Sequence, residues 1–281
     1  SETGSSQRRI IYPKYKLNRK QKNEDDFKDQ SFTTQKNRVK QYLEETFVRQ
    51  LEVEQSEADD LIAYYCQISE DEDKTIFSSD RDLTQLISEK VTIYSPQQKR
   101  YYKNGDGIKI YESEIPHYNV KTYKILTGDS SDNIDGIFYL GEKTFLKLFP
   151  EILDTELKYT DILTKAEMLL SEQKGNVALQ NLLSGKTKEG IFGEEFFTIN
   201  EKLVDLANPL ISHEGKELVR SYYSESLDPD GRGHRNLIRM MMEDGFFKFL
   251  PKGDDAWVNF LKPFLKLSRK EKTNFRNKTK K

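Results

Sequence analysis

Cysteine is almost absent from this sequence, because Cys66 is the only one in 281 residues. One cysteine excludes a disulfide framework and points to a reducing compartment. Long apolar runs are also missing. No stretch approaches the roughly 18 apolar residues of a membrane span, so we expect no integral membrane protein. The three histidines are scattered, and with one cysteine they form no zinc signature.

The net charge is also small, at −2, but the charges are segregated along the chain. Seven basic residues and no acidic one lie between Arg8 and Lys22. Nine basic residues and one acidic residue, Glu271, lie between Lys262 and Lys281. Basic ends around an acidic middle favour a protein that holds a polyanion and also binds cations. Solvated terminal runs are the alternative.

Local patterns predict an α/β part followed by a mainly helical part. Val39, Leu43 and Phe47 are four residues apart, which predicts a helix within 33–51. Ser56 is a candidate N-cap for a second helix, with Asp59 three residues on. Predicted strands are Lys74–Ser79 and Val91–Ser95, and a hairpin is predicted over 98–112 with its turn at Asn104-Gly105 and Asp106-Gly107. After Thr127 short helical stretches dominate, so we expect a domain boundary there.

Three groups of carboxylates stand out by position. They are Glu57, Asp59 and Asp60, then Asp80 and Asp82 after a predicted strand, then Asp129 and Asp132. Each group alone is weak, because an aspartate at a strand end is often a turn or cap residue. Gathered together, seven carboxylates repel one another unless cations neutralise them. Ligands that are all oxygen favour Mg²⁺ or Mn²⁺ over zinc.

Four segments in this order resemble the 5′-nuclease superfamily, which includes flap endonucleases and the 5′-nuclease domains of bacterial DNA polymerases. They are YPKYKLNR at 12–19, EADDLIA at 57–63, SSDRDLTQL at 78–86 and LTGDSSDNIDGI at 126–137. The stretch at 95–103 is most similar to the RNase H enzymes of T-even-type phages. The resemblance implies an α/β fold. A PIN-like 5′-nuclease domain with a central parallel sheet covers residues 1–126; it is expected to be incomplete at its N-terminus and to hold a basic arch at residues 8–22. A mainly helical C-terminal region with a helix-hairpin motif and a basic tail covers 127–281.

The resemblance also implies hydrolysis of phosphodiester bonds at 5′ ends in duplexes, with two Mg²⁺ ions, or Mn²⁺ in their place. The implied metal ligands are Glu57, Asp59, Asp60, Asp80, Asp82, Asp129 and Asp132. Asp60, with Glu57, Asp59 and Asp80, belongs to the tighter of the two metal sites in that family. Lys16 and Arg19 match basic residues of an arch that touch the scissile phosphate.

Contacts to nucleic acid are implied for Arg8, Arg9, Tyr12, Lys14, Tyr15, Lys20, Gly141 and Lys143. Tyr12 and Tyr15 alternate with basic residues. Their rings either stack on an unpaired nucleobase or pack within the arch. Gly141 and Lys143 are phosphate contacts or an ordinary helix start. Both alternatives stay open at this point.

Two departures from the family pattern affect these expectations. The strands that come first in the family, each with an aspartate, have no counterpart before YPKYK. The chain is then expected to be a fragment, one half of a split gene product, or a degenerate relative, although seven retained carboxylates argue against decay. In the helix-hairpin, Tyr139 stands where the family has a glycine, and a bulky residue adopts positive φ only at a cost.

Three functions follow from these patterns. The first is a metal-dependent 5′→3′ nuclease that removes primers or flaps during DNA replication. The second is a non-catalytic or split nucleic-acid-binding portion, active only with a polypeptide that supplies the missing strands. The third is a general interaction protein with charged surfaces. By family analogy the protein partners are a single-strand-binding protein and a sliding clamp, in the cytoplasm of a cell or of a phage host. Preference for RNA or DNA, and for exonuclease or flap cleavage, stays open.

Overall fold

The chain folds into two compact units in a computed structural model that describes residues 6–20, 26–190, 192–249 and 253–278. The first unit contains residues 1–22 and 53–216, and the second contains 23–52 and 217–281. The predicted boundary near residue 126 falls inside the first unit, where helix α5 (Val120–Thr127) packs against helix α9 (Glu194–Val204). A subdivision at residue 126 therefore stays a prediction.

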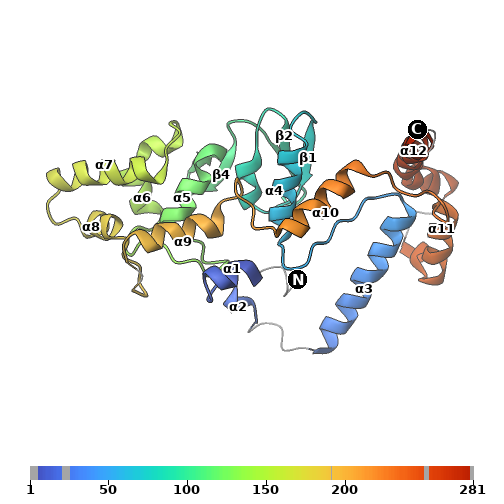
Figure 1. The fold of residues 1–281 in the computed structure, drawn as a ribbon, viewed down its shortest axis with the longest axis horizontal. Helices are drawn as coiled ribbons and strands as arrows, with labels where there is room; N and C mark the ends of the chain where they lie inside the picture. Colours follow the sequence, from blue (N-terminus) through green and yellow to red (C-terminus); the bar gives the residue numbers. More distant parts are fainter. Residues whose placement is uncertain (1–5, 21–25, 191, 250–252, 279–281) are drawn as a thin grey trace. The chain divides into compact units, whose positions relative to one another are not determined.

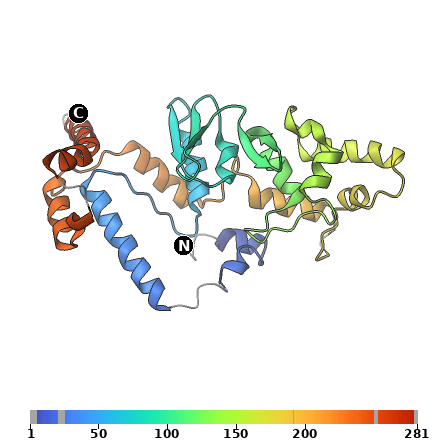
Figure 2. The ribbon, with the colours of Figure 1, turned by 180° about the vertical axis from the view of Figure 1, so that it is seen from behind.

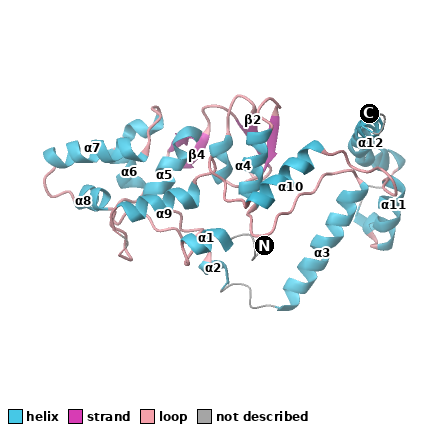
Figure 3. Ribbon diagram, viewed as in Figure 1, coloured by secondary structure: helices cyan, strands magenta, loops and turns pink. Residues whose placement is uncertain are grey.

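The first unit combines helices with two small sheets (Figure 1). Its other helices are α1 (Ser6–Ile11), α2 (Leu17–Lys20), α4 (Ala58–Ile68), α6 (Glu142–Leu148), α7 (Tyr159–Glu172) and α8 (Val177–Ser184). The strands are β1 (Lys74–Phe77), β2 (Val91–Ser95), β3 (Arg100–Tyr102), β4 (Gly107–Ile110) and β5 (Ser113–Pro116). The 3-10 turns are η1 (Asp82–Leu86), η2 (His117–Asn119) and η3 (Pro150–Leu153). In the described residues no strand follows β5, as Figure 3 shows, so the predicted change to helical structure is confirmed.

The larger sheet has the strand order β1-β2-β3. β1 and β2 are parallel, with Lys74 opposite Val91 and Phe77 opposite Tyr94, and β3 is antiparallel to β2. Both predicted strands are confirmed. Among the described strands this is the one parallel pair, and the α/β class is confirmed. Buried Ile76, Val91 and Ile93 form one side of its core.

The hairpin predicted over 98–112 is wrong. The chain does turn at Asn104-Gly105, where the Asp106 amide donates to the Lys103 carbonyl at 2.9 Å. However, β3 pairs with β2, whereas β4 pairs with β5. The buried residues explain this choice, because Ile108 and Ile110 of β4 join the large core of the unit and not the β1–β2 core.

A large apolar core holds α5, α6, α8 and α9 together, and α5 lies beside α9 in both ribbon views (Figures 1 and 2). Phe145, Phe149 and Phe196 are among its fully buried side chains. Helix α5 is buried over most of its length, so its end is fixed where the Asp129 segment begins. Burying an aromatic side chain of this kind stabilises the fold by about 1.5–3 kcal/mol.

The amide of Asn200 ties the Asp129 segment to helix α9. Its Nδ2 donates to the carbonyls of Ile125, at 2.9 Å, and Asp135, at 2.8 Å. Asn200 is buried, and its amide satisfies a buried carbonyl at Ile125 and a partly buried one at Asp135.

The second unit is helical in its described residues, with α3 (Asp26–Glu45), α11 (His234–Glu243), η4 (Phe246–Phe249) and α12 (Asp254–Lys278). Helix α10 (His213–Ser224) contains the boundary between the units. Leu237, Met241 and Leu261 form the buried core of this unit. The predicted helix within 33–51 is confirmed as far as Glu45, where it ends before Phe47, which is buried at a φ of +64°. Among the described helices, none is long and apolar enough to cross a membrane.

Candidate active site

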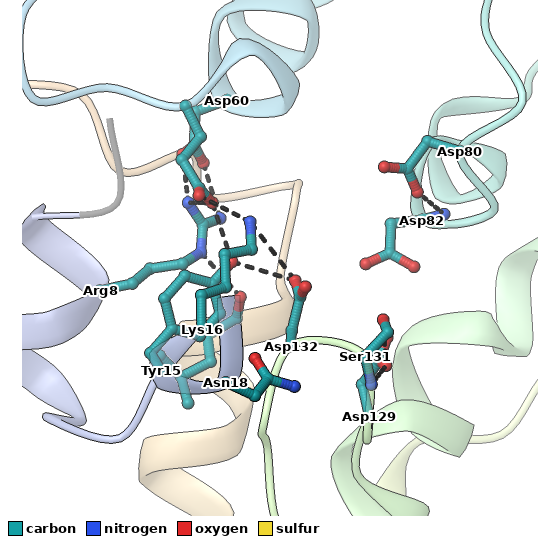
Figure 4. Close-up of polar contacts among 12 residues, drawn as sticks. Arg8, Tyr15, Lys16, Asn18, Asp60, Asp80, Asp82, Asp129, Ser131 and Asp132 are labelled. Carbon is teal, nitrogen blue, oxygen red and sulfur yellow. Dashed lines mark hydrogen bonds and ion pairs between the residues drawn. The ribbon is translucent and has the colours of Figure 1, made fainter. Parts of the chain in front are cut away.

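A cleft of about 700 Å³ in the first unit gathers side chains from all three acidic groups. Five of the seven predicted ligands line it: Asp59, Asp80, Asp82, Asp129 and Asp132. Lys16, Arg81, Lys124 and Glu142 line it as well. Segments far apart in the sequence therefore meet in one acidic site, and Figure 4 shows its polar contacts.

The first acidic group sits at the start of helix α4. Glu57 is the N-cap residue, so the predicted N-cap at Ser56 is wrong, and the buried Ser56 hydroxyl has no partner among the described groups. Asp59 and Asp60 follow in the first turn, where the helix dipole stabilises negatively charged side chains. Successive helical residues point about 100° apart. Asp59 therefore faces the cleft while Asp60 points into the protein and is 1% exposed.

Asp60 is paired with the buried guanidinium of Arg8. The Arg8 Nη2 donates to Asp60 Oδ1 at 2.9 Å, and Nη1 donates to Oδ2. Arg8 Nε also donates to the Leu203 carbonyl at 2.9 Å, and the Leu210 amide donates to Asp60 Oδ1 at 3.0 Å. Here Asp60 is the ion-pair partner of buried Arg8 and does not line the cleft. The roles expected for Asp60 as a metal ligand and for Arg8 as a nucleic-acid contact stay predictions.

Lys16 bridges the first and third acidic groups. Its ammonium donates to Glu57 Oε1 at 2.6 Å and lies 3.4 Å from Asp132 Oδ2. The Tyr15 hydroxyl donates to Glu57 Oε2 at 2.8 Å. Burial alone raises the pKa of Glu57, but the hydrogen bond and charge of Lys16 and the charge of Arg8 outweigh it and hold that pKa below its usual value. Glu57 is thus ionised and already neutralised by side chains.

Tyr12 and Tyr15 pack into the core of the first unit. Tyr12 and Tyr15 are 7% and 2% exposed, and the Tyr12 hydroxyl donates to Asp135 Oδ2 at 2.8 Å. Of the two alternatives for these rings, this structure shows packing, and stacking on a base stays a prediction. The rings pack in this way because both join the large apolar core.

The other basic residues of the arch are less enclosed. Arg9 is half-buried and its Nε donates to the Tyr15 carbonyl at 3.3 Å. Lys14 is exposed and paired with Glu189. The backbones of Arg19 and Lys20 belong to α2, but their side chains lie outside the described part of the chain.

The second acidic group follows β1 directly. Asp80 is exposed, and the Asp82 amide donates to Asp80 Oδ1 at 3.0 Å, which starts the 3-10 turn η1. The chain therefore turns at this point. Both carboxylates still line the cleft.

The third group lies on a tight loop that requires two glycines. Gly128 has a φ of +71°, and a Cβ on it would lie 2.5 Å from the Gly136 amide nitrogen. A Cβ on Gly136 would lie 2.0 Å from the Thr127 carbonyl oxygen. The two backbones therefore touch, and the loop between them presents Asp129 and Asp132. Ser131 donates to Asp129 Oδ1 through its amide, at 2.8 Å, and its hydroxyl, at 2.7 Å.

Lys124 is a member of the site that the sequence did not reveal. Its ammonium donates to Asp129 Oδ2 at 2.7 Å and also to Asp82, and it is 8% exposed. Burial lowers the pKa of Lys124, but the charges of Asp82 and Asp129 outweigh it and raise that pKa. The sequence offers one indication that Lys124 is buried, because it stands between the apolar residues Tyr123, Ile125 and Leu126 of helix α5.

Of the five cleft aspartates, Asp59 and Asp80 form no ion pair with a described side chain. Burial and the negative charge of Asp80 raise the pKa of Asp59 to about 6. Within the described residues, no three acidic, histidine or cysteine side chains are close enough to hold one ion together. The donor set nevertheless fits Mg²⁺, which is commonly held by one or two carboxylates, waters and substrate phosphates.

The helix-hairpin segment lies at the edge of this cleft. Gly141 is the exposed N-cap residue of α6 and lines the cleft, and Lys143 is exposed in the first turn. Tyr139 has a φ of +67°, so the bulky residue does adopt the backbone conformation of the glycine that the family has there.

Comparisons with known proteins show which families and folds this chain is similar to. Residues 1–113 match the family described as "5'-3' exonuclease, N-terminal resolvase-like domain". The resemblance to the 5′-nuclease superfamily, which the four motifs indicate, is therefore confirmed.

Two curated relatives show the extent of the similarity. DNA polymerase I of Rhizobium leguminosarum is 38% identical over 112 residues, which cover 38% of this chain and 11% of that protein. The 5'-3' exonuclease of Mycoplasmopsis pulmonis is 32% identical over 150 residues, which cover 52% of this chain and 47% of that protein. The chain thus matches a small part of the polymerase and about half of the exonuclease.

Solved structures of similar fold come from bacteriophage T5. A T5 5'-exonuclease with bound zinc has a TM-score of 0.58 and 22% identity, covering 85% of this chain and 79% of that chain. A T5 flap endonuclease in a pseudo-enzyme-product complex with DNA and metal ions has a TM-score of 0.55 and 22% identity, covering 95% of this chain and 81% of that chain. At these identities the likeness concerns the fold, and it confirms the mixed α/β class.

Proposed function

We propose that this chain is a Mg²⁺-dependent 5′→3′ nuclease of the RNase H or flap endonuclease type. It hydrolyses phosphodiester bonds at the 5′ ends of RNA or DNA in duplexes and so removes primers or flaps during DNA replication. Its partner is a duplex or branched nucleic acid with a 5′ end. The match of residues 1–113 to a 5′-3′ exonuclease family supports the reaction class.

The observation that carries this proposal is the meeting of five aspartates in one cleft. Asp59, Asp80, Asp82, Asp129 and Asp132 come from three separate segments, and the cleft gathers them around a space of about 700 Å³. Like charges at this density destabilise a fold unless cations bind there. Lys124 and Lys16 neutralise part of the charge, and the pair Asp59 and Asp80 has no such partner among the described side chains.

We assign the divalent cations to the five cleft aspartates, with Asp59 and Asp80 as the principal ligands. When bound, these cations polarise the phosphate and stabilise the negative charge that develops during hydrolysis. Glu57 and Asp60 hold Lys16 and Arg8 in place instead. Lys16 borders the cleft. When the substrate binds, the Lys16 ammonium leaves Glu57 and Asp132 and contacts the scissile phosphate. Arg19 assists it in this contact.

Further contacts to the substrate are assigned to Arg9, Lys14, Lys20, Gly141 and Lys143. Gly141 and Lys143 are exposed beside the cleft, and the Lys14 side chain is half exposed. Arg8, Tyr12 and Tyr15 are left out of this set because they are buried and hydrogen-bonded.

The test is cleavage of an RNA–DNA hybrid that carries a label at its 5′ end. We expect labelled short products with Mg²⁺ and none with EDTA. Asp80→Asn removes a principal ligand and abolishes cleavage. Asp73→Asn is the matched control, because Asp73 is exposed and pairs with Lys90 outside the cleft, and it cleaves like the unchanged chain. Cleavage that continues in EDTA contradicts the proposal.

A second candidate function is favoured by the edge of the larger sheet. Among the described strands, β1 pairs with β2 alone, and Phe77 at its end is 70% exposed. An open edge of this kind pairs readily with a further strand. The chain is then the nucleic-acid-binding portion of a nuclease that a second polypeptide completes. It binds the same hybrid and cuts it only after such a strand is supplied, whereas cleavage by the chain alone contradicts this candidate.

A further inference from the structure

Tyr139 combines an exposed ring with a strained backbone. The residue is 63% exposed, and its φ of +67° lies in the left-handed region. A non-glycine residue in this region costs free energy that glycine avoids. Where such strain persists, the side chain is a candidate for a function outside the core.

The ring rests on a well-anchored segment. It stacks on Phe138 with ring centroids 4.0 Å apart and an angle of 30° between the planes. The Phe138 amide donates to the Lys186 carbonyl at 2.9 Å, and Asn181 Nδ2 donates to the Phe138 carbonyl at 2.8 Å. Ile137 and Leu140 on either side are buried. The two rings therefore form a fixed aromatic ledge, which loses little conformational entropy when it binds a flat group.

The surroundings of this ledge are basic. Lys143 and Lys147 are exposed on α6, one helical turn apart, and Lys186 and Lys188 lie on the segment that pairs with residues 137–138. Of these four lysines, none forms an ion pair with a described residue. The acids on the same two segments, 141–148 and 186–190, are Glu142, which borders the cleft, and Glu189, which is paired with Lys14. An aromatic ring among unpaired lysines fits a ligand that has both flat rings and phosphates.

We propose that Tyr139 stacks on a base of the nucleic acid, at an unpaired or terminal position, while Lys143 and Lys147 bind the adjacent phosphates. Gly141 and Glu142, which line the carboxylate cleft, are two and three residues away along the chain. The ledge therefore holds the strand next to the point of cleavage. This inference rests on the proposed nuclease function. It adds to that function a stacking contact that the Tyr139 ring can make and a glycine cannot.

The test compares binding of the full chain and its variants to a fluorescent RNA–DNA hybrid in EDTA, where no cleavage is expected. Tyr139→Gly removes the ring and relieves the strain, so we expect a higher melting temperature and affinity weaker by about fivefold or more. Tyr139→Phe keeps the ring and keeps the affinity. Gln55→Gly is the matched control, because Gln55 is exposed at a φ of +58° and has no ring, and it leaves the affinity unchanged.

The outcomes separate this contact from the proposed function. If the unchanged chain binds the hybrid and Tyr139→Gly binds it equally well, the stacking role is wrong and the nuclease function stands. If the unchanged chain neither binds nor cuts the hybrid, the proposed function itself fails, and the inference with it. Tyr139→Asn keeps the test valid should the glycine variant fold poorly, since asparagine tolerates the left-handed conformation without a ring, and its affinity is expected to match that of Tyr139→Gly.

Discussion

Arg8 and Asp60 form a buried, two-pronged ion pair, with Arg8 Nη2 2.9 Å from Asp60 Oδ1 and only 4% and 1% of the two residues exposed. The pair links helix α1 to the start of α4, and Arg8 extends it to the Leu203 carbonyl of α9. It separates two aspartates that are adjacent in sequence. Asp59 faces the cleft, while Asp60 anchors helix α1 to the rest of the first unit through Arg8.

The first prediction concerns the stability that this pair provides. Arg8→Leu leaves the Asp60 carboxylate buried without a cation, so we expect the free energy of unfolding to fall by about 3–5 kcal/mol. Chemical denaturation measures it. Arg9→Leu is the control on the same helix, because it removes one bond of 3.3 Å and is expected to cost about 1 kcal/mol or less. Equal losses in the two variants contradict the structural role of the pair.

The second prediction concerns Lys124, which neutralises Asp82 and Asp129. Lys124→Met leaves both carboxylates unpaired, so we expect a loss of about 2 kcal/mol in unfolding free energy without divalent ions. Mg²⁺ then restores more stability to the variant than it adds to the unchanged chain, because it replaces the missing charge. Thermal melts with and without Mg²⁺ measure this. Lys124→Arg keeps the charge and serves as the control, and identical Mg²⁺ effects in both variants count against the prediction.

The third prediction is a dependence of stability on pH through His117. Burial holds the pKa of His117 below its ordinary value of 6.5, although Asp106 and Glu156 oppose the shift. The folded chain therefore takes up this proton less readily than the unfolded chain. The stability that His117 contributes is complete above pH 6.5 and is lost as the pH falls below it. Urea unfolding at several pH values measures the slope.

His117→Asn removes this group and is expected to flatten the stability profile below pH 6.5. His213→Asn is the control, because His213 is exposed. An unchanged slope in His117→Asn shows that other groups cause the pH dependence.

The fourth prediction tests how the fold fixes the third acidic group. Asn200→Ala leaves the carbonyls of Ile125 and Asp135 without their donor, at an expected cost of about 1–3 kcal/mol. Cleavage also falls, because both carbonyls flank the loop that carries Asp129 and Asp132. Asn37→Ala, at an exposed site of helix α3, is expected to stay within about 0.5 kcal/mol. Full cleavage by a destabilised Asn200→Ala chain separates the two effects and contradicts the link to the loop.

Residue patterns were sufficient for the parts of the fold that local chemistry decides. The strands β1 and β2 were predicted at 74–79 and 91–95, and the spacing of Val39 and Leu43 predicted helix α3. The sequence at 98–112 has a turn that fits a hairpin, yet it does not encode which strands pair. That choice depends on the core that Ile108 and Ile110 join, and such long-range packing is not visible in a local pattern.

The candidate site was likewise predictable where local motifs decide it, and not where long-range packing does. The motifs identified which aspartates converge, and five of them line one cleft. They did not separate Asp59 from Asp60, because the difference arises from a cation 52 residues earlier in the chain, at Arg8. Lys124 was missed because one lysine in an amphipathic helix usually points to solvent, whereas here two carboxylates draw it inside.

The most direct measurement is calorimetric titration of the chain with Mn²⁺, in parallel for Asp80→Asn and Asp60→Asn, with each variant first shown to be folded at the chosen temperature. If the cleft aspartates hold the metal while Asp60 serves Arg8, the unchanged chain binds Mn²⁺, Asp80→Asn loses that binding, and Asp60→Asn keeps it at reduced stability. Loss of binding in Asp60→Asn with retention in Asp80→Asn, or no binding by the unchanged chain, contradicts this assignment of the site.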